Sequence, residues 1–147
     1  MGFFDPLRFS AGKSDEVMNL YREAELKHGR VAQLAVLGYL VQEIGRFPGE
    51  LSLGLKFDDV PNGIDAISVV PALGWAQIFI GVGLVETKES AIFEQGLLNL
   101  PDDILEKRKL CELQHGRIAM LAIAELVRHD YFDGPGEKLL QGLPFLY

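Results

Sequence analysis

The chain carries the motif Glu25-Leu26-Lys27-His28-Gly29-Arg30 and repeats it as Glu112-Leu113-Gln114-His115-Gly116-Arg117. Each copy opens a long apolar stretch, and eight of the eleven residues at 25–35 are identical to their counterparts at 112–122. Such a density of identities indicates a duplicated element. The sequence therefore predicts two equivalent helices that place a carboxylate, an imidazole and a guanidinium beside hydrocarbon.

The Glu and Arg residues of the motif are expected to pair between the two helices. On one helix, Arg30 follows Glu25 by five residues and points roughly 140° away from it. Two helices related by a twofold axis instead exchange equivalent contacts. We therefore expect the crossed ion pairs Glu25–Arg117 and Glu112–Arg30.

The same motif suits a metal-centred ligand. A Glu neutralised by Arg keeps oxygen lone pairs, so it can coordinate a metal without leaving an uncompensated charge. A neutral imidazole is a good axial donor. These properties predict that Glu25, His28, Glu112 and His115 bind the ligand. Small residues at three-residue spacing leave room for a close helix or a flat macrocycle, and they are Gly29, Ala32, Ala35 and Gly38 in the first copy and Gly116, Ala119 and Ala122 in the second.

Length and composition limit the class of protein. The 147 residues, 1–147, are expected to form one domain, and 48% of them are hydrophobic. The net charge of −7 argues against a nucleic-acid-binding protein. The single cysteine, Cys111, allows no disulfide within the chain, and no combination of nucleophile, base and orienting residue indicates an enzyme. The N-terminus resembles neither a signal peptide nor a transit sequence, so any targeting segment is expected to have been removed or to lie outside this numbering.

Three long apolar segments predict helices at about 15–44, 64–86 and 101–130. The middle segment is nearly uncharged and long enough to cross the roughly 30 Å hydrocarbon core of a bilayer. Pro71 near its start predicts a kink or a late helix start. The outer segments are longer and charged at their ends, as expected of tilted helices that reach water. The expected fold is an all-α membrane protein with three transmembrane helices, the first and third crossed and related by pseudo-twofold symmetry.

The basic residues predict the orientation of this fold. Apart from Arg30 and Arg117, eight basic residues fall on the side of the N-terminus and of the 86–109 connection, and four fall on the opposite side. Positive residues mark the side of a membrane protein that is not translocated. The N-terminus is therefore expected to face the cytoplasm-like compartment.

These residues resemble the light-harvesting chlorophyll-binding proteins. The resemblance covers essentially the whole chain, from the opening Gly2-Phe3-Phe4-Asp5-Pro6-Leu7 through both copies of the motif. Arg46-Phe47-Pro48-Gly49-Glu50 and Val60-Pro61-Asn62-Gly63 look most like the chlorophyll a/c antennae of the fucoxanthin and peridinin types. Residues 21–25 and 74–79 tilt the resemblance toward the membrane-intrinsic peridinin type of dinoflagellates.

The resemblance implies which side chains bind chlorophyll magnesium. His115 stands where many relatives carry Asn, and His129 stands where they commonly carry a Gln ligand. Gln77 and Glu86 match positions that bind further chlorophylls. Gln42, the repeat mate of His129, lies near a predicted helix end and is expected to be solvated. The ligands implied in this way are Glu25, His28, Gln77, Glu86, Glu112, His115 and His129.

The resemblance also implies cofactors, partners and location. The cofactors are chlorophyll a, chlorophyll c and carotenoids, namely peridinin or fucoxanthin together with diadinoxanthin, and magnesium enters only within chlorophyll. The partners are other light-harvesting subunits, the core of photosystem I or II and thylakoid lipids. The protein is expected to cross the chloroplast thylakoid membrane several times, with its N-terminus on the stromal side.

Two alternatives remain open from the sequence. Paired Glu-x-x-His motifs on two helices also occur in ferritin-like diiron proteins, although that site needs a Glu from each of two further helices and the motif Arg would repel the metals. A photoprotective, energy-dissipating member of the same superfamily would share the fold and the motif. Such a protein would sense luminal acidity, and the candidate acidic residues, expected to be ordinary loop carboxylates, are Asp58, Asp59, Asp130 and Asp133.

Overall fold

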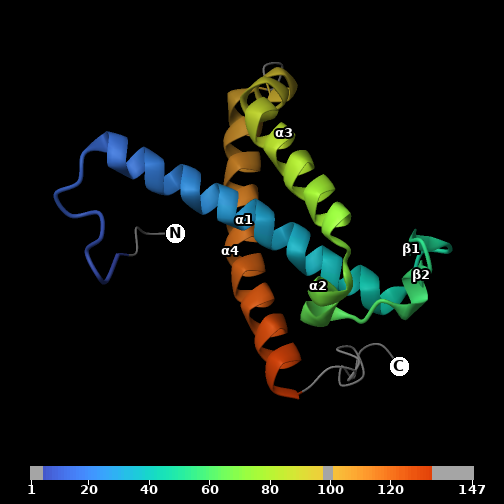
Figure 1. The fold of residues 1–147 in the computed structure, drawn as a ribbon. Helices are drawn as coiled ribbons and strands as arrows, with labels where there is room; N and C mark the ends of the chain where they lie inside the picture. Colours follow the sequence, from blue (N-terminus) through green and yellow to red (C-terminus); the bar gives the residue numbers. More distant parts are fainter. Residues whose placement is uncertain (1–4, 98–100, 134–147) are drawn as a thin grey trace.

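The crossing of two long helices determines the shape of the molecule. In the computed structural model, which describes residues 5–97 and 101–133, α1 (Asp15–Ile44) and α4 (Asp102–Asp133) cross near their middles (Figure 1). α1 spans the range expected from the sequence, whereas α4 ends at Asp133 rather than at residue 130. Both helices begin with two acidic residues, which interact favourably with the positive end of the helix dipole.

The two helices meet at their motif glycines. A Cβ atom built on Gly29 would lie 2.9 Å from the Cα of Gly116, and the converse distance is also 2.9 Å. Ala32 and Ala119 are buried, with exposed fractions of 6% and 8%. The small residues of the repeat therefore let the two backbones come into direct contact, as their spacing predicted.

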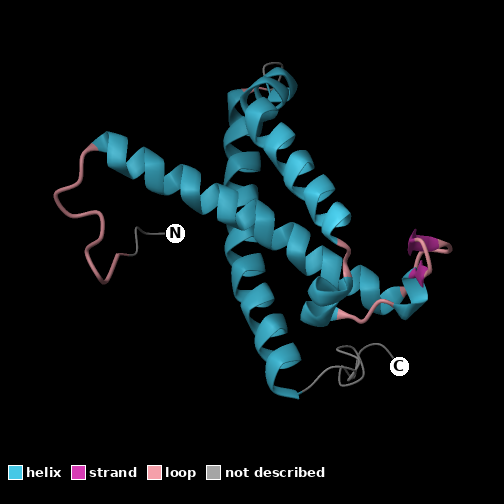
Figure 2. Ribbon diagram, viewed as in Figure 1, coloured by secondary structure: helices cyan, strands magenta, loops and turns pink. Residues whose placement is uncertain are grey.

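A series of short elements connects α1 to the third long helix. β1 (Glu50–Ser52) and β2 (Leu55–Lys56) pair antiparallel, and Figure 2 shows this hairpin at one end of an otherwise helical molecule. The hairpin adds a small strand pair to the all-α architecture expected from the sequence. It is followed by two 3-10 turns, η1 (Phe57–Asp59) and η2 (Gly63–Asp65), and by the single turn α2 (Ala66–Val69).

The middle helix differs from the single helix expected at 64–86. α2 ends at Val69, and α3 (Ala72–Leu97) begins directly after Pro71. Proline lacks a backbone N–H donor and clashes with the preceding turn, so a helix cannot run through it undisturbed. The long helix therefore starts later and runs further than the expected range of 64–86, and the break lies at Pro71, where a kink or a late helix start was expected.

Within the described residues, no helix taken alone has both the length and the apolar character that a membrane crossing requires. The segments Gly63–Val69 and Ala72–Thr87 meet that requirement together, by length and composition, with a bend of 111° between them. The predominantly helical fold is confirmed, and the three membrane crossings stay a prediction.

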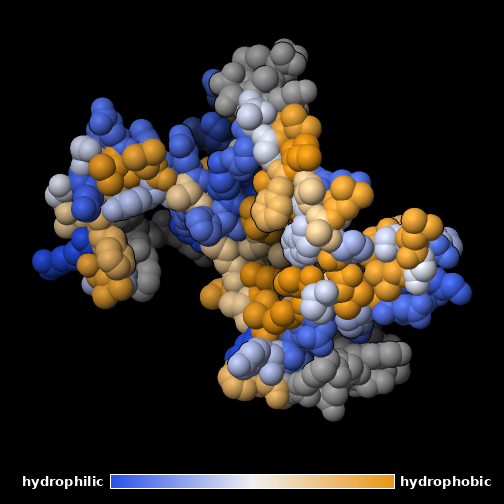
Figure 3. All heavy atoms as spheres, in the orientation of Figure 1, coloured by the Kyte–Doolittle hydropathy of each residue, from blue (hydrophilic) through white to orange (hydrophobic). Residues whose placement is uncertain are grey.

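Much of the apolar surface is exposed. The buried hydrophobic side chains of the described part are confined to Ala32, Val60, Leu113 and Ala119. Large apolar side chains along α3 are exposed, for example Leu73 at 72%, and Figure 3 shows apolar atoms over α3 and around the helix crossing. Exposed apolar surface of this extent marks a site of contact with other apolar material.

Candidate functional site

Two crossed ion pairs join α1 to α4. Arg30 Nε lies 2.6 Å from Glu112 Oε1, and Arg117 Nε lies 2.7 Å from Glu25 Oε1. These are the pairings expected from the twofold relation of the motifs. The Glu25 and Glu112 side chains are 29% and 36% exposed, so the protein alone does not enclose them. Each carboxylate is therefore neutralised by an arginine and still accessible to a ligand.

The two motif histidines have the same hydrogen bond. His28 Nδ1 lies 2.7 Å from the carbonyl oxygen of Ala24, and His115 Nδ1 lies 2.8 Å from that of Cys111. A carbonyl oxygen only accepts hydrogen bonds, so Nδ1 carries the proton and donates it, which leaves the lone pair on Nε2. Metal-binding histidines commonly fix their unligated nitrogen in this way. Both imidazoles are exposed, so each Nε2 atom would be accessible to a metal-centred ligand.

An apolar hollow of about 510 Å³ lies beside His28. Residues from both crossed helices contribute to it, and most of them carry hydrocarbon side chains or small methyl groups. A flat apolar molecule held at the imidazole would therefore contact both helices at once. The lining residues are Lys27, His28, Val31, Ala32, Ala35, Met120 and Ile123.

The two expected ligands on α3 lie apart from the crossing motifs. Gln77 is exposed near the N-terminal end of the helix. Glu86, just past the middle, forms an ion pair with α1, in which Lys27 Nζ lies 2.6 Å from Glu86 Oε2. This carboxylate is therefore neutralised by a cation from another helix, as Glu25 and Glu112 are. No motif in the sequence indicates this role of Lys27.

Asp130 and Gln42 have structural roles that correct the expectations for both residues. Asp130 belongs to α4 rather than to a loop, and its Oδ2 accepts a hydrogen bond of 2.7 Å from the backbone N–H of Ile64. Gln42 Oε1 accepts one of 3.1 Å from the backbone N–H of Gly63. Gln42 is therefore a partner of the connecting segment rather than a solvated side chain. The neighbouring His129 is half-buried, and its ligand role stays a prediction.

Further polar contacts hold the connecting segment to the end of α1. Asn62 Nδ2 donates to Glu43 Oε1 at 2.6 Å, and Arg46 donates to Asn62 Oδ1. Tyr39 of α1 donates to Asp130 Oδ2 at 3.4 Å. The sequence signal for this cluster was the turn Val60-Pro61-Asn62-Gly63, but its partners lie far away along the chain. The cluster joins α1, the connecting segment and α4 at one end of the molecule.

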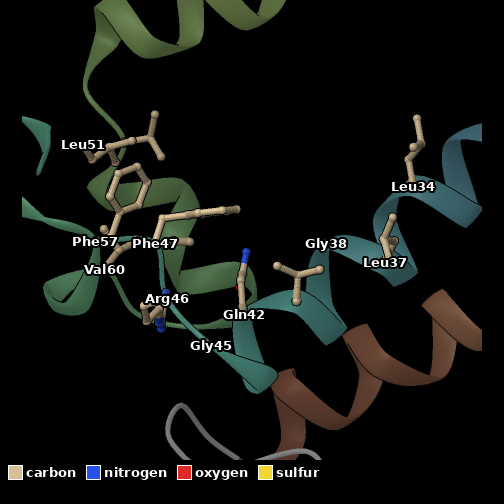
Figure 4. Close-up of a pocket in the computed structure, with 13 residues that line it drawn as sticks. Leu34, Leu37, Gly38, Gln42, Gly45, Arg46, Phe47, Leu51, Phe57 and Val60 are labelled. Atoms are coloured by element: carbon tan, nitrogen blue, oxygen red, sulfur yellow. The ribbon is translucent and has the colours of Figure 1, made fainter. Parts of the chain in front are cut away.

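A second apolar cavity, of about 470 Å³, lies next to this polar cluster. Figure 4 shows Phe47, Leu51 and Phe57 of the connecting segment on one side, with Leu34 and Leu37 of α1 on the other. Its size and apolar walls suit the end of an elongated apolar molecule or a hydrocarbon tail.

The N-terminal segment begins with an ordered turn around Asp5. Its carboxylate accepts hydrogen bonds from the backbone N–H groups of Phe9, at 3.0 Å, and Ser10, at 2.9 Å, and also from the Ser10 hydroxyl. These hydrogen bonds, first of all that from the Ser10 side chain, lower the pKa of the Asp5 carboxyl. The preceding residues 1–4 lie outside the described part.

The diiron alternative requires several carboxylates and histidines to converge on one point. Across residues 5–97 and 101–133, no group of three or more His, Cys, Asp or Glu side chains is arranged to hold a metal ion. The motif carboxylates instead face arginines of the opposite helix. The described residues therefore give no support to a ferritin-like centre.

Comparison with known proteins places this arrangement in one family. Residues 1–131 match the family model of the chlorophyll A-B binding protein. Fucoxanthin-chlorophyll a-c binding protein B of Phaeodactylum tricornutum is 35% identical, over 97% of this chain and 79% of the relative. Fucoxanthin-chlorophyll a-c binding proteins E and D of Macrocystis pyrifera are 34% and 35% identical, over 88% of this chain and 69% and 81% of the relatives. The chain, with its glycine crossing and duplicated Glu, His and Arg groups, belongs to the chlorophyll a-b binding protein family.

Proposed function

We propose that this protein is a light-harvesting antenna that binds chlorophyll a, chlorophyll c and carotenoids. The observation that carries the proposal is the duplicated donor set, in which each crossed helix presents a neutralised carboxylate and an imidazole fixed through Nδ1. The bound pigments supply the absorption of light and the transfer of its energy, whereas the chain supplies ligands, geometry and an apolar environment. We assign no enzymatic activity to the protein.

The proposed ligands fall into two groups. Glu25, His28, Glu112 and His115 lie on the crossed helices, and the ion pairs and the hydrogen-bonded imidazoles support their assignment. These residue types suit chlorophyll, because carboxylate oxygens and a neutral imidazole nitrogen are suitable donors for the magnesium of a macrocycle. The other proposed ligands, supported by family resemblance, are Gln77, Glu86 and His129.

The proposed setting is the chloroplast thylakoid membrane. The family membership, the chloroplastic relatives and the exposed apolar side chains along the helices support this location. In the proposed topology the chain crosses the membrane three times, through α1, the bent α2 and α3 pair and α4, with the N-terminus on the stromal side. Its proposed partners are other antenna subunits and the core of photosystem I or II.

Pigment extraction tests the function directly. The purified native protein is expected to yield chlorophyll a and chlorophyll c with a carotenoid in fixed ratios. The relatives are named for fucoxanthin, whereas the sequence features at 21–25 and 74–79 favour peridinin. The carotenoid that is found therefore decides between the fucoxanthin type and the peridinin type. Absence of chlorophyll would overturn the proposal. A strongly shortened chlorophyll fluorescence lifetime in the isolated protein would instead indicate the energy-dissipating alternative.

Replacing either motif histidine is expected to remove a chlorophyll. His28→Leu and His115→Leu each lack the axial donor, so we expect each variant to bind one chlorophyll fewer per chain. His115→Asn keeps a donor and should retain the pigment. Asn19→Leu places the same new side chain at an exposed position of α1 and serves as the control. Pigment-to-protein ratios measured after reconstitution check these results, and a ratio unchanged in His28→Leu would refute that ligand.

Removing the arginine of a crossed pair is expected to affect pigment binding more than protein stability. In Arg117→Leu, Glu25 loses its nearer cation and keeps only Arg22, whose Nη1 lies 3.6 Å from Glu25 Oε2, and a poorly compensated carboxylate beside an apolar pigment is costly. Because the pair is partly exposed, the ion pair itself contributes only about 1 kcal/mol or less to folding. We expect loss of the chlorophyll at Glu25 and its partial recovery in Arg117→Lys, measured by pigment stoichiometry. Full pigment content in Arg117→Leu would contradict this role of the pair.

A further inference from the structure

α3 has little direct packing against the crossed helices. Of the long helices in the described part, α1 and α4 are in extensive contact with each other, whereas α3 has no comparable contact with either. Its large side chains, including Leu73, Phe79 and Val85, are 72%, 71% and 62% exposed. Apolar contacts within the protein therefore do not fix the position of this helix.

Polar contacts connect α3 to the crossed pair before its N-terminus and near its middle. Before the α3 N-terminus, η2 is held to α4 by the hydrogen bond from the Ile64 N–H to Asp130 Oδ2. Just past the middle of α3, Lys27 Nζ of α1 lies 2.6 Å from Glu86 Oε2. The Lys27 and Glu86 side chains are 51% and 47% exposed. The bend of 111° before α3 means that the first contact alone does not define its direction.

The two copies of the motif differ at the position that makes the second contact. Lys27 of the first copy corresponds to the uncharged Gln114 of the second, between the conserved Glu-Leu and His-Gly-Arg parts. The helices that carry the copies are equivalent at the crossing, but Glu86 of α3 pairs with α1. The two copies of the motif therefore differ at the residue that pairs with α3, and the pairing of α3 with α1 is what breaks the twofold symmetry.

We propose that the Lys27–Glu86 ion pair sets the position of α3 relative to the crossed helices. An exposed ion pair in water contributes little to stability. It contributes more where competing water is scarce. This inference rests on the proposed function, in which lipid and pigment surround α3. Lys27 is therefore a positioning residue: it precedes His28 and lines the hollow beside it, and it determines how far α3 lies from that site.

Charge-reversal variants distinguish a role of the ion pair in positioning α3 from a general disruption of the complex. Lys27→Glu and Glu86→Lys each place like charges opposite one another, while the double variant restores an ion pair of the opposite sense. Gln114→Glu introduces the same carboxylate at the repeat position on α4, with a change of one charge instead of two, and serves as the control. All variants are reconstituted as full-length pigmented complexes, so that the pigments around α3 are present.

Distances between spin labels provide the readout. In a Cys111→Ser background, labels at Leu20 of α1 and Ile80 of α3 report the position of α3, and labels at Leu20 and Leu121 report the crossed pair; all three sites are exposed. Each single reversal is expected to lengthen or broaden the α1–α3 distance distribution and to leave the α1–α4 distribution unchanged. The double reversal should restore the original α1–α3 distribution, and Gln114→Glu should not disturb it.

Two results would overturn the proposal. One is an α1–α3 distribution that neither single reversal changes, and the other is a double reversal that leaves the distribution as disturbed as the single ones. The pigment content provides a separate measurement: Glu86→Lys and the double variant both lack the Glu86 carboxylate, so a chlorophyll bound there is lost in both. A restored distance with a chlorophyll still missing supports positioning by charge, and absence of chlorophyll from the unmodified complex contradicts the antenna function instead.

Discussion

Gly116→Ala is expected to cause a large loss of stability, matched on α1 by its repeat counterpart Gly29→Ala. The Cβ added at Gly116 would lie 2.9 Å from Gly29 Cα and 3.5 Å from the Gly29 carbonyl carbon. The atoms it meets are backbone atoms, which cannot rotate away as a side chain can. Overpacking of a rigid contact typically costs about 1–3 kcal/mol, and separation of the helices would also stretch both crossed ion pairs. We therefore expect destabilisation of about 2 kcal/mol or more, together with lost pigment.

Gly38→Ala is the matched control for this substitution. Gly38 lies in α1 three residues after Ala35, and a Cβ built there meets no atom within 4 Å. Alanine favours a helix over glycine by about 1 kcal/mol, so this variant should be as stable as the original or slightly more stable. The midpoint temperature of chlorophyll release from each purified complex measures the difference. Equal midpoints for Gly116→Ala and Gly38→Ala would show that the helices do not need glycine at the crossing.

The repeat made the centre of this fold predictable. A duplicated motif implies a twofold relation, and that relation assigns Glu25 to Arg117 and Glu112 to Arg30 without knowledge of the coordinates. The small residues at three-residue spacing likewise identify the face on which the helices approach. The repeat also indicated which side chains could act as ligand donors. The hydrogen bonds of His28 and His115 could not be predicted from it, because they depend on side-chain rotamers.

The parts that sequence reasoning missed depend on contacts without a local signal. Asp130 looked like a loop carboxylate because Gly134 and Pro135 follow closely, yet it lies in α4 and accepts a hydrogen bond from Ile64. Lys27 looked like an ordinary charged residue on the solvated part of a helix. Its partner Glu86 lies 59 positions away, and no periodic pattern relates the two residues. Pro71 signalled a kink or a late start in the apolar run at 64–86, but the bend of 111° did not follow from the sequence because composition does not show the direction of the chain.

Gly63→Ala is expected to release the connecting segment from both long helices. Gly63 has a φ of +67°, in the left-handed region, where a side chain costs about 1–2 kcal/mol. Its Cβ would collide with the Asp130 carboxylate, approaching Cγ at 2.7 Å and Oδ1 at 2.8 Å. Moving that carboxylate leaves the part-buried Ile64 N–H without its acceptor, which costs about 1 kcal/mol, the lower end of the range for an unsatisfied buried donor. We expect a total loss of about 2–4 kcal/mol, seen as an earlier release of chlorophyll on heating.

Two further variants separate the backbone strain from the collision. Gly54 also has a left-handed φ, of +84°, but a Cβ built there meets nothing within 4 Å, so Gly54→Ala should show the cost of the backbone conformation alone. Asp130→Ala removes the colliding carboxylate together with its hydrogen bond. If the collision is the main cost, Gly63→Ala in the Asp130→Ala background should cost no more than Gly54→Ala does, because the two substitutions then affect the same contact. Additive losses in the double variant would mean that Gly63 is required for its backbone conformation and that Asp130 acts independently of it.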